Sequence, residues 1–207
     1  MISVSYLKSK YSKKETIKLI DQSITDYIHV DLMDGIYVDN KNFTINEVID
    51  DLKDTHKPLD IHLMVNKPEE YINYLAKLHP EFITFHLDST DNPLDVIDLI
   101  KDYNIKVVIA INPNEDIYIL DNYYNLIDYV LIMSVYPGKG GQEFIPDVLN
   151  KVKLLENKEL LIGIDGGINS TSINNLRDYK IDIIVSGSFI CMSDNYNQQI
   201  SLLKNNE

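Results

Sequence analysis

Short runs of apolar, mostly β-branched residues recur along the chain and predict strands. Several of these runs are apolar throughout instead of alternating, which is typical of parallel strands covered on both faces. Eight runs fit this description: Ile2–Ser5, Tyr27–Asp31, Leu59–Met64, Phe82–Phe85, Lys106–Ile111, Tyr129–Met133, Leu160–Ile164 and Ile183–Val185.

Segments with helical spacing lie between these strands. The first, Lys13–Ile24, carries isoleucines three and four residues apart, which places them on one stripe of a helix. Proline suits the first turn of a helix, and serine or threonine suits the capping position before it. On these grounds, further helices are expected to begin at Pro68, at Pro93, at Pro146 and after the candidate caps Ser170 and Thr171.

Strands that alternate with helices predict either a closed (β/α)₈ barrel or an open, doubly wound parallel sheet. The count of eight favours the barrel, although 207 residues is near the short end of its usual size. No linker, repeat or low-complexity tract divides the chain, so we expect one domain over residues 1–207. Active sites of such barrels lie where the strands end.

Two histidines and two aspartates fall at the carboxyl ends of predicted strands. His29 and Asp31 lie on the second strand and share one face, while His62 and Asp165 lie on the third and seventh. Any one of them alone is equally well explained as a helix cap or a core residue. Four at matching heights instead favour a joint site, and this ligand set suits one divalent metal ion, Zn²⁺, Fe²⁺, Mn²⁺ or Co²⁺.

Glycine-rich loops follow the sixth, seventh and eighth predicted strands. Clustered glycines let backbone N–H groups converge on an anion, and barrels often bind phosphate after their last strands. A single glycine pair is weak support, because turns use glycine for their geometry alone. Three adjacent loops strengthen the prediction of a phosphate site at Gly138-Lys139-Gly140-Gly141, Gly166-Gly167 and Gly187-Ser188.

Other residues near the predicted mouth are less informative. Met33, Met64 and Met133 end three strands and are expected to form an apolar lining above the metal, although methionine is more often core filler. His86 ends the fourth strand and is a candidate pocket residue without an evident partner. Cys191 is interpreted as structural.

Composition narrows the choice of partners and compartment. A net charge of −13 makes nucleic acid and anionic membranes unsuitable as main partners. Arg177 is the sole arginine, so a phosphate would have to be held largely by backbone groups. One cysteine fits a reducing compartment, and no apolar run is long enough to be a signal peptide or membrane span. We therefore expect a cytoplasmic protein.

Taken together, these motifs resemble the ribulose-phosphate 3-epimerase family nearly from end to end. The motifs that carry the resemblance are Ser5-Tyr6-Leu7, residues His29–Gly35, residues Asp60–Val65, residues Pro137–Gln142, Asp165-Gly166-Gly167 and Gly187-Ser188. It implies a single-domain (β/α)₈ TIM barrel of the ribulose-phosphate-binding type. It also implies an isomerase of the pentose phosphate pathway that interconverts ribulose 5-phosphate and xylulose 5-phosphate.

The resemblance also assigns roles to particular residues. It implies that His29, Asp31, His62 and Asp165 bind the metal and that Asp31 and Asp165 are the acid/base pair. The implied substrate contacts are Ser5, His62, Gly138, Lys139, Gly140, Gly141, Asp165, Gly166, Gly167, Gly187 and Ser188. The expected partner is a small ketose phosphate, and an exposed apolar helix face would support a homo-oligomer of open size.

Three positions depart from the family's usual pattern: Asp39, where proline is usual, and Tyr136 and Lys139 in the glycine loop. They leave open a related substrate such as allulose 6-phosphate. A decarboxylase of the related barrels would need lysine where His62 stands, and an aldolase would need a lysine inside the barrel. A non-catalytic sugar-phosphate-binding barrel is the remaining alternative.

Overall fold

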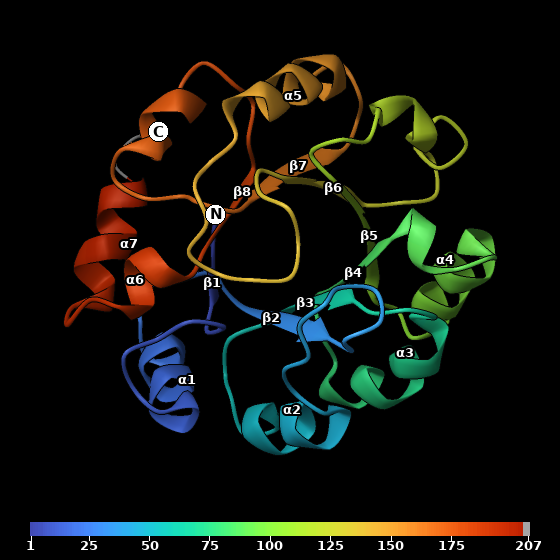
Figure 1. The fold of residues 1–207 in the computed structure, drawn as a ribbon. Coiled ribbons are helices and arrows are strands. Elements are labelled where there is room, and N and C mark those ends of the chain that lie inside the picture. The colour runs from blue at the N-terminus through green and yellow to red at the C-terminus, as the bar shows by residue number, and fades with distance from the viewer. Residues whose placement is uncertain (205–207) are drawn as a thin grey trace.

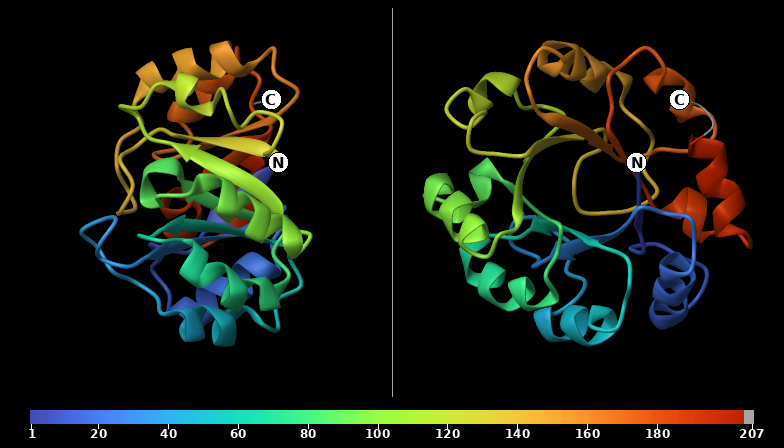
Figure 2. Two further views of the ribbon diagram at one scale, coloured as in Figure 1. Left: turned by 90° about the vertical axis from the view of Figure 1, so that its right-hand side faces the viewer. Right: turned by 180° about the vertical axis from the view of Figure 1, so that it is seen from behind.

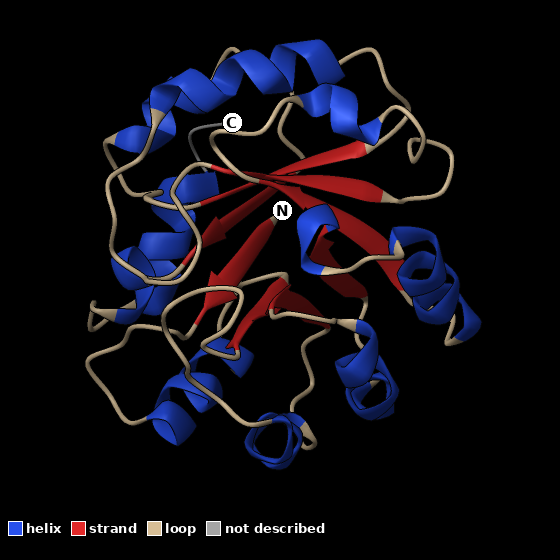
Figure 3. Ribbon diagram, turned by 45° about the vertical axis from the view of Figure 1, so that its right-hand side comes forward, coloured by secondary structure: helices blue, strands red, loops and turns tan. Residues whose placement is uncertain are grey.

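Eight parallel strands close into a barrel in simple chain order, with helices around the outside (Figures 1 and 3). The structure, a computed structural model, describes residues 1–204. Each strand pairs with the next, and β8 pairs with β1 to complete the ring. The predicted (β/α)₈ TIM barrel is therefore confirmed, and the open, doubly wound alternative is excluded.

The strands lie close to the predicted runs. They are β1 (Ile2–Ser5), β2 (Tyr27–Met33), β3 (Leu59–Met64), β4 (Phe82–His86), β5 (Lys106–Ile111), β6 (Tyr129–Met133), β7 (Leu161–Asp165) and β8 (Ile183–Ser186). The largest difference is at β2, which continues two residues beyond the predicted end at Asp31. Every other strand end lies within one residue of its predicted position.

The α-helices are α1 (Lys13–Asp21), α2 (Ile45–Leu52), α3 (Glu69–Leu75), α4 (Pro93–Asp102), α5 (Leu149–Leu155), α6 (Ser188–Cys191) and α7 (Tyr196–Lys204). Short 3₁₀ turns complete the connections: η1 (Ala76–Leu78), η2 (Leu87–Ser89), η3 (Ile117–Leu120), η4 (Pro146–Val148) and η5 (Ser172–Leu176). None of the helices within residues 1–204 has the length and apolar character needed to cross a membrane.

Three helix predictions need correction. The first helix ends at Asp21, three residues before the predicted end. Helix α2 was not predicted, although Thr44 and Glu47 form a capping box at its start. Ser170 and Thr171 do not cap the segment after β7, because Asn169 Oδ1 instead accepts hydrogen bonds from the backbone N–H groups of Thr171 and Ser172.

Side chains alternate along each strand, so one face of every strand points into the barrel. The outward face packs against the helices in a continuous apolar core. The inward face differs between the two halves of the barrel. Strands β5, β6 and β8 contribute apolar residues to a second core, whereas β1 to β4 contribute most of the buried polar side chains. This polar half, together with Asp165 at the end of β7, holds the candidate site.

Long loops cover the end of the barrel at which the strands finish. The loops after β2 and β6 both project from this end (Figure 2). They are joined by a hydrogen bond of 2.6 Å from Asn40 Nδ2 to the carbonyl oxygen of Gly138. Val38 also packs beneath Gly138. The two loops therefore form one cover over the mouth of the barrel.

Tyr129 fills the interior of the barrel opposite Gly163. A Cβ on Gly163 would lie 2.4 Å from the Tyr129 ring, which is fully buried. We expect Gly163→Ala to lower the free energy of unfolding by about 1–3 kcal/mol, because an overpacked core must shift. Denaturant unfolding followed by circular dichroism measures this change.

Gly140→Ala is the matched control, since a Cβ there meets its nearest neighbour at an ordinary 3.4 Å. Adding Tyr129→Leu to Gly163→Ala should recover part of the loss through a favourable coupling energy. A Gly163→Ala variant as stable as the parent protein would contradict this account of the interior.

Candidate active site

Four side chains converge at the carboxyl end of the barrel. One nitrogen or oxygen from each of His29, Asp31, His62 and Asp165 lies within 4.8 Å of the others. Asp31 Oδ1 is 3.4 Å from both His29 Nε2 and His62 Nδ1. Asp165 Oδ2 is 3.9 Å and 3.8 Å from the same two nitrogens. The structure therefore brings together all four predicted metal ligands.

Parallel strand register explains this convergence. Asp31 on β2 lies opposite His62 on β3, and Met133 on β6 lies opposite Asp165 on β7. His29 precedes Asp31 by two residues, so both point into the barrel. Because the ladder fixes these positions, the cluster is built on rigid strands instead of mobile loops.

The cluster fits a divalent metal ion. His29 Nε2 and His62 Nδ1 are buried nitrogens without a hydrogen-bond partner among the described residues, and both face the aspartates. A tetrahedral ion bonded at ~2.1 Å separates its ligand atoms by ~3.4 Å, close to the distances observed here. A bound cation would satisfy both nitrogens and balance the carboxylate charge.

Asp60 supports His29 from below. His29 Nδ1 lies 2.8 Å from Asp60 Oδ2, and Ser3 Oγ donates to the same oxygen at 2.8 Å. All three side chains are buried. A carboxylate in this position keeps the histidine proton on Nδ1, which leaves the Nε2 lone pair free to bind a metal. Our sequence analysis missed Asp60, although it lies two residues before His62 and therefore on the same strand face.

His86 supports His62 and does not line the cavity as a pocket residue. The two Nε2 atoms are 2.9 Å apart, so His62 is the partner that the sequence did not reveal. Burial lowers the pKa of His86 well below the usual range for histidine, and the neighbouring His62 adds to this effect. Both effects favour the neutral form of His86.

Burial and mutual charge set the protonation of the cluster. Burial raises the pKa of Asp165 to about 6, with His29 opposing this shift and Asp31 adding to it. Burial acts in the same direction on Asp31, but His29 and His62 outweigh it and hold its pKa far below the usual range. Burial would lower the pKa of His29, yet Asp60 and Asp31 raise it well above normal, so a metal that binds at His29 Nε2 would displace a proton from that atom. Two carboxylates with pKa values pushed apart are typical of acid/base pairs.

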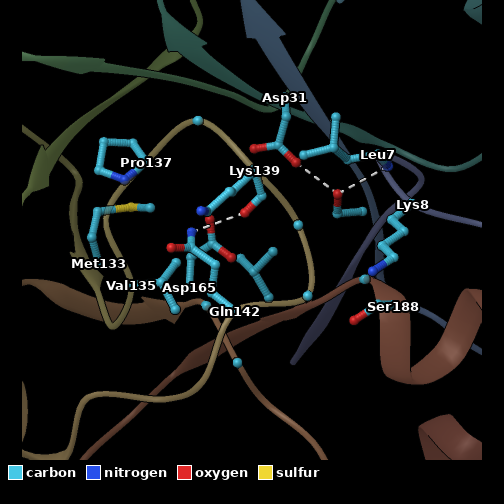
Figure 4. Close-up of a pocket in the computed structure, with 18 of the residues that line it drawn as sticks. Leu7, Lys8, Asp31, Met133, Val135, Pro137, Lys139, Gln142, Asp165 and Ser188 are labelled. Carbon is cyan, nitrogen blue, oxygen red and sulfur yellow. Dashed lines mark hydrogen bonds between the residues drawn. The ribbon is translucent and has the colours of Figure 1, made fainter. Parts of the chain in front are cut away.

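A cavity opens above the cluster (Figure 4), and Asp31 and Asp165 form part of its floor. His29 and His62 lie beneath it and are fully buried, so His62 is the one predicted substrate contact that does not line the cavity. The remaining predicted contacts and the methionines do line it: Ser5, Met33, Met64, Met133, Gly138, Lys139, Gly140, Gly141, Gly166, Gly167, Gly187 and Ser188.

The glycine loops form one wall of the cavity. Gly167 has a φ of +67°, and a Cβ there would lie 2.4 Å from the backbone nitrogen of Phe144, so only glycine fits. Within residues 1–204, the backbone N–H groups of Gly140, Gly141, Gly167 and Ser188 donate to no protein acceptor. This wall therefore contains several backbone N–H groups that protein acceptors do not occupy.

Lys8 also lines this part of the cavity, and the sequence analysis did not identify it. Its ammonium lies 2.8 Å from where a Cβ on Gly141 would be. Lys8 makes no salt bridge within the part of the chain that the structure describes. Lys8 directly follows the Ser5-Tyr6-Leu7 motif, and this position could have indicated from the sequence that it lines the cavity. Cys191 is buried, in agreement with its structural interpretation.

Sequence comparison places the chain among known proteins. Residues 1–191 match the model of the ribulose-phosphate 3 epimerase family. A ribulose-phosphate 3-epimerase of Buchnera aphidicola subsp. Baizongia pistaciae is 38% identical, with 97% of this chain and 92% of the relative covered. The enzyme of the same name from Bacillus subtilis strain 168 is 32% identical, with 91% and 90% covered.

Solved structures confirm the fold at greater distance. The structure of 3-hexulose-6-phosphate synthase from Salmonella typhimurium superposes with a TM-score of 0.71, and 99% of this chain and 97% of that chain are covered. The two sequences are 14% identical, so this likeness concerns the barrel fold alone.

The Asp60–His29 contact generates a testable prediction about metal binding. Asp60→Asn should weaken Co²⁺ or Zn²⁺ binding by about 10–100-fold, because a neutral amide removes the negative charge that makes His29 a stronger ligand and accepts the Nδ1 proton less strongly than a carboxylate. Titration of the metal-free protein followed by absorption spectroscopy or calorimetry measures the affinity.

Thr84→Val is the matched control for Asp60→Asn. Thr84 lies in the same interior, opposite His62, and its buried hydroxyl has no partner among the described residues. This variant should bind metal as tightly as the parent protein. If the Asp60→Asn variant binds Co²⁺ or Zn²⁺ as tightly as the parent protein, other contacts hold His29 in place.

Proposed function

This chain belongs to the ribulose-phosphate 3-epimerase family, and we propose that it interconverts D-ribulose 5-phosphate and D-xylulose 5-phosphate by proton transfer at C3. Its relatives of that name are isomerases, so the reaction class follows from the family. The observation that carries the substrate proposal is a cavity with two aspartates at its floor and a wall of free glycine-loop amides.

Epimerisation at C3 sets clear demands on a site. The proton on C3 is weakly acidic, and its electron pair must move into a C2–C3 double bond while the C2 carbonyl oxygen becomes negative. A proton must then return to the opposite face of C3. Two groups on opposite sides of the planar enediolate meet this demand, and two carboxylates can serve.

Asp31 and Asp165 are the proposed proton carriers. They come from β2 and β7, and the sticks in Figure 4 show both carboxylates turned toward the same cavity. Ser5 Oγ donates a hydrogen bond of 2.6 Å to Asp31 Oδ2, which fixes the orientation of this carboxylate. One aspartate removes the C3 proton, and the other delivers a proton from the opposite side.

The metal proposal concerns the same residues. His29, Asp31, His62 and Asp165 would hold one divalent ion, and when bound that ion supplies positive charge that stabilises the negative enediolate. Met33, Met64 and Met133 line the cavity beside these residues. Their apolar side chains keep water away from the reactive intermediate.

The phosphate end of the substrate is assigned to the glycine wall. The free N–H groups of Gly140, Gly141, Gly167 and Ser188 can donate to phosphate oxygens without a bidentate arginine. Lys8 lies beside Gly141 and supplies the positive charge that these amides lack. This division places the reacting carbon over β2, β3 and β7 and the phosphate over the last loops.

Substrate length is the remaining question. Of the three positions that depart from the family pattern, Tyr136 and Lys139 line the cavity, whereas Asp39 does not. These two side chains could alter the preference between a pentulose and a hexulose phosphate.

A non-catalytic barrel is the second alternative. A cytoplasmic location and a homo-oligomer stay predictions.

Solvent isotope exchange tests the proposed function. Metal-loaded protein is incubated with ribulose 5-phosphate or allulose 6-phosphate in deuterated water, and deuterium at C3 is followed by NMR. We expect exchange with ribulose 5-phosphate, with accumulation of xylulose 5-phosphate. Preference for the hexulose would replace the pentulose assignment, and no exchange with either would reject the epimerase proposal.

Asp31→Asn and Asp165→Asn sharpen this assay. Each should slow exchange by at least about 10²-fold, because an amide cannot accept the C3 proton or return one. Metal content is measured for each variant, so that loss of the ion is distinguished from loss of the proton carrier. Near-normal exchange in either variant would remove that aspartate from the proposed mechanism.

Lys8→Met tests the phosphate assignment. The KM for the ketose phosphate should rise about tenfold, since a charge-assisted contact is lost, while kcat changes little. Lys14→Met is the matched control, because Lys14 is exposed on α1 and does not line the cavity. Steady-state kinetics measure both. An unchanged KM in Lys8→Met would place the phosphate elsewhere.

A further inference from the structure

His62 is held between the metal-ligand cluster and a second histidine. Its Nδ1 faces Asp31 and Asp165, while its Nε2 lies 2.9 Å from Nε2 of His86. The two ring centroids are 5.1 Å apart and the ring planes differ by only 28°, so the rings meet edge to edge with the two Nε2 atoms between them. Both side chains are fully buried, so no solvent contact sets their proton positions.

When two neutral imidazoles face each other nitrogen to nitrogen, one proton lies between the two nitrogens, and one ring donates it to the other. If His86 donates it, the proton of His62 must sit on Nδ1, which blocks the atom that faces the cluster. If His62 donates it from Nε2, its Nδ1 lone pair is free to bind a metal. Only the second arrangement agrees with His62 as a ligand.

We propose that His86 is a positioning residue that accepts the Nε2 proton of His62 and so presents the His62 Nδ1 lone pair to the metal. This inference rests on the proposed metal site and deepens it. His86 does not line the cavity and lies outside the four-residue cluster, so its role runs through His62 alone.

The neighbours of His86 fix its ring. Tyr37 packs against it with ring centroids 4.9 Å apart. The Tyr37 hydroxyl donates to Asp88 Oδ1 at 2.8 Å and accepts from Asn112 Nδ2 at 3.2 Å. These two hydrogen bonds anchor the tyrosine, which holds the imidazole plane against His62. The proposed arrangement leaves the His86 proton on Nδ1, which has no acceptor among the described residues.

Charge explains why a neutral acceptor suits this position. Asp31, Asp60 and Asp165 already place three carboxyl groups around the site. A fourth carboxylate behind His62 would weaken the stabilisation of a negative intermediate in a buried site. Imidazole accepts the same proton without adding charge.

Metal titration with two substitutions tests the proposal. His86→Leu removes the acceptor and should weaken Co²⁺ binding by about 10–100-fold. His86→Gln restores an acceptor through its amide oxygen and should recover most of this loss. His56→Leu is the control for removing an exposed histidine that could bind added metal, and it should retain parent affinity.

Nitrogen NMR of the Zn²⁺-bound parent protein gives a second readout that does not depend on activity. The His62 resonances should show a protonated Nε2 and a metal-bound Nδ1. A proton on His62 Nδ1 would overturn the proposal, as would equal Co²⁺ affinity of the parent and both His86 variants. If His86→Leu does not fold, the Co²⁺ affinity of His86→Gln and the NMR assignment of the parent protein test the proposal without it.

The same titrations distinguish failure of the proposed metal site from failure of the role of His86. A parent protein that binds neither Co²⁺ nor Zn²⁺ would reject the four-residue metal site itself, and the role of His86 with it. Tight binding by the parent together with full binding by the variants would reject only the role of His86.

Discussion

The structure depends on holding three carboxylates and three imidazoles around one buried point. Removing charged groups from water costs several kcal/mol each unless they are paired. Here Asp31 and Asp60 lie against histidines, while Asp165 faces the same rings from across the site. Only a frame that cannot relax will keep such groups together, and the closed ladder of a parallel barrel provides it. The carboxyl end of this barrel is therefore where the burial of charged groups costs free energy and where the strand ladder fixes the positions of the side chains.

The remaining interior offsets this cost with apolar contacts. Tyr129 and Phe82 meet edge to face with ring centroids 5.4 Å apart, and Gly163 makes room for the tyrosine. Apolar residues of β5, β6 and β8 extend this inner core. One half of the barrel thus packs as an ordinary core, which leaves β1 to β4 free to carry polar groups. In the proposed function, proton chemistry lies between Asp31 at the polar half and Asp165 at the end of β7, and the phosphate is held by the loops after β6, β7 and β8.

Much of the fold and of the cluster could be predicted because strand alternation is a local rule. His29 and Asp31 share an inward face by counting alone. Helix α2 was missed although its apolar residues Val48 and Leu52 have helical spacing and follow the capping box of Thr44 and Glu47. The supporting residues were harder to predict for a physical reason. His86 acts through Nε2 of His62, which points away from the cavity. The two histidines lie on neighbouring strands, so their contact cannot be found from the spacing of residues along one strand. A single sequence shows which face a residue occupies, but not which strand lies beside it or at what height.

Contacts made by backbone groups would also allow so acidic a chain to hold the anionic substrate that we propose. The net charge of −13 with a single arginine opposes any phosphate that approaches the surface. Backbone N–H groups carry no net charge, and within the described residues those of Gly140, Gly141, Gly167 and Ser188 have no protein acceptor. Under this proposal, the donors that line the cavity matter more than the overall charge, and Lys8 is the ammonium group that lies beside them. In the proposed function, binding of the phosphate therefore depends on the geometry of three loops instead of on a basic surface.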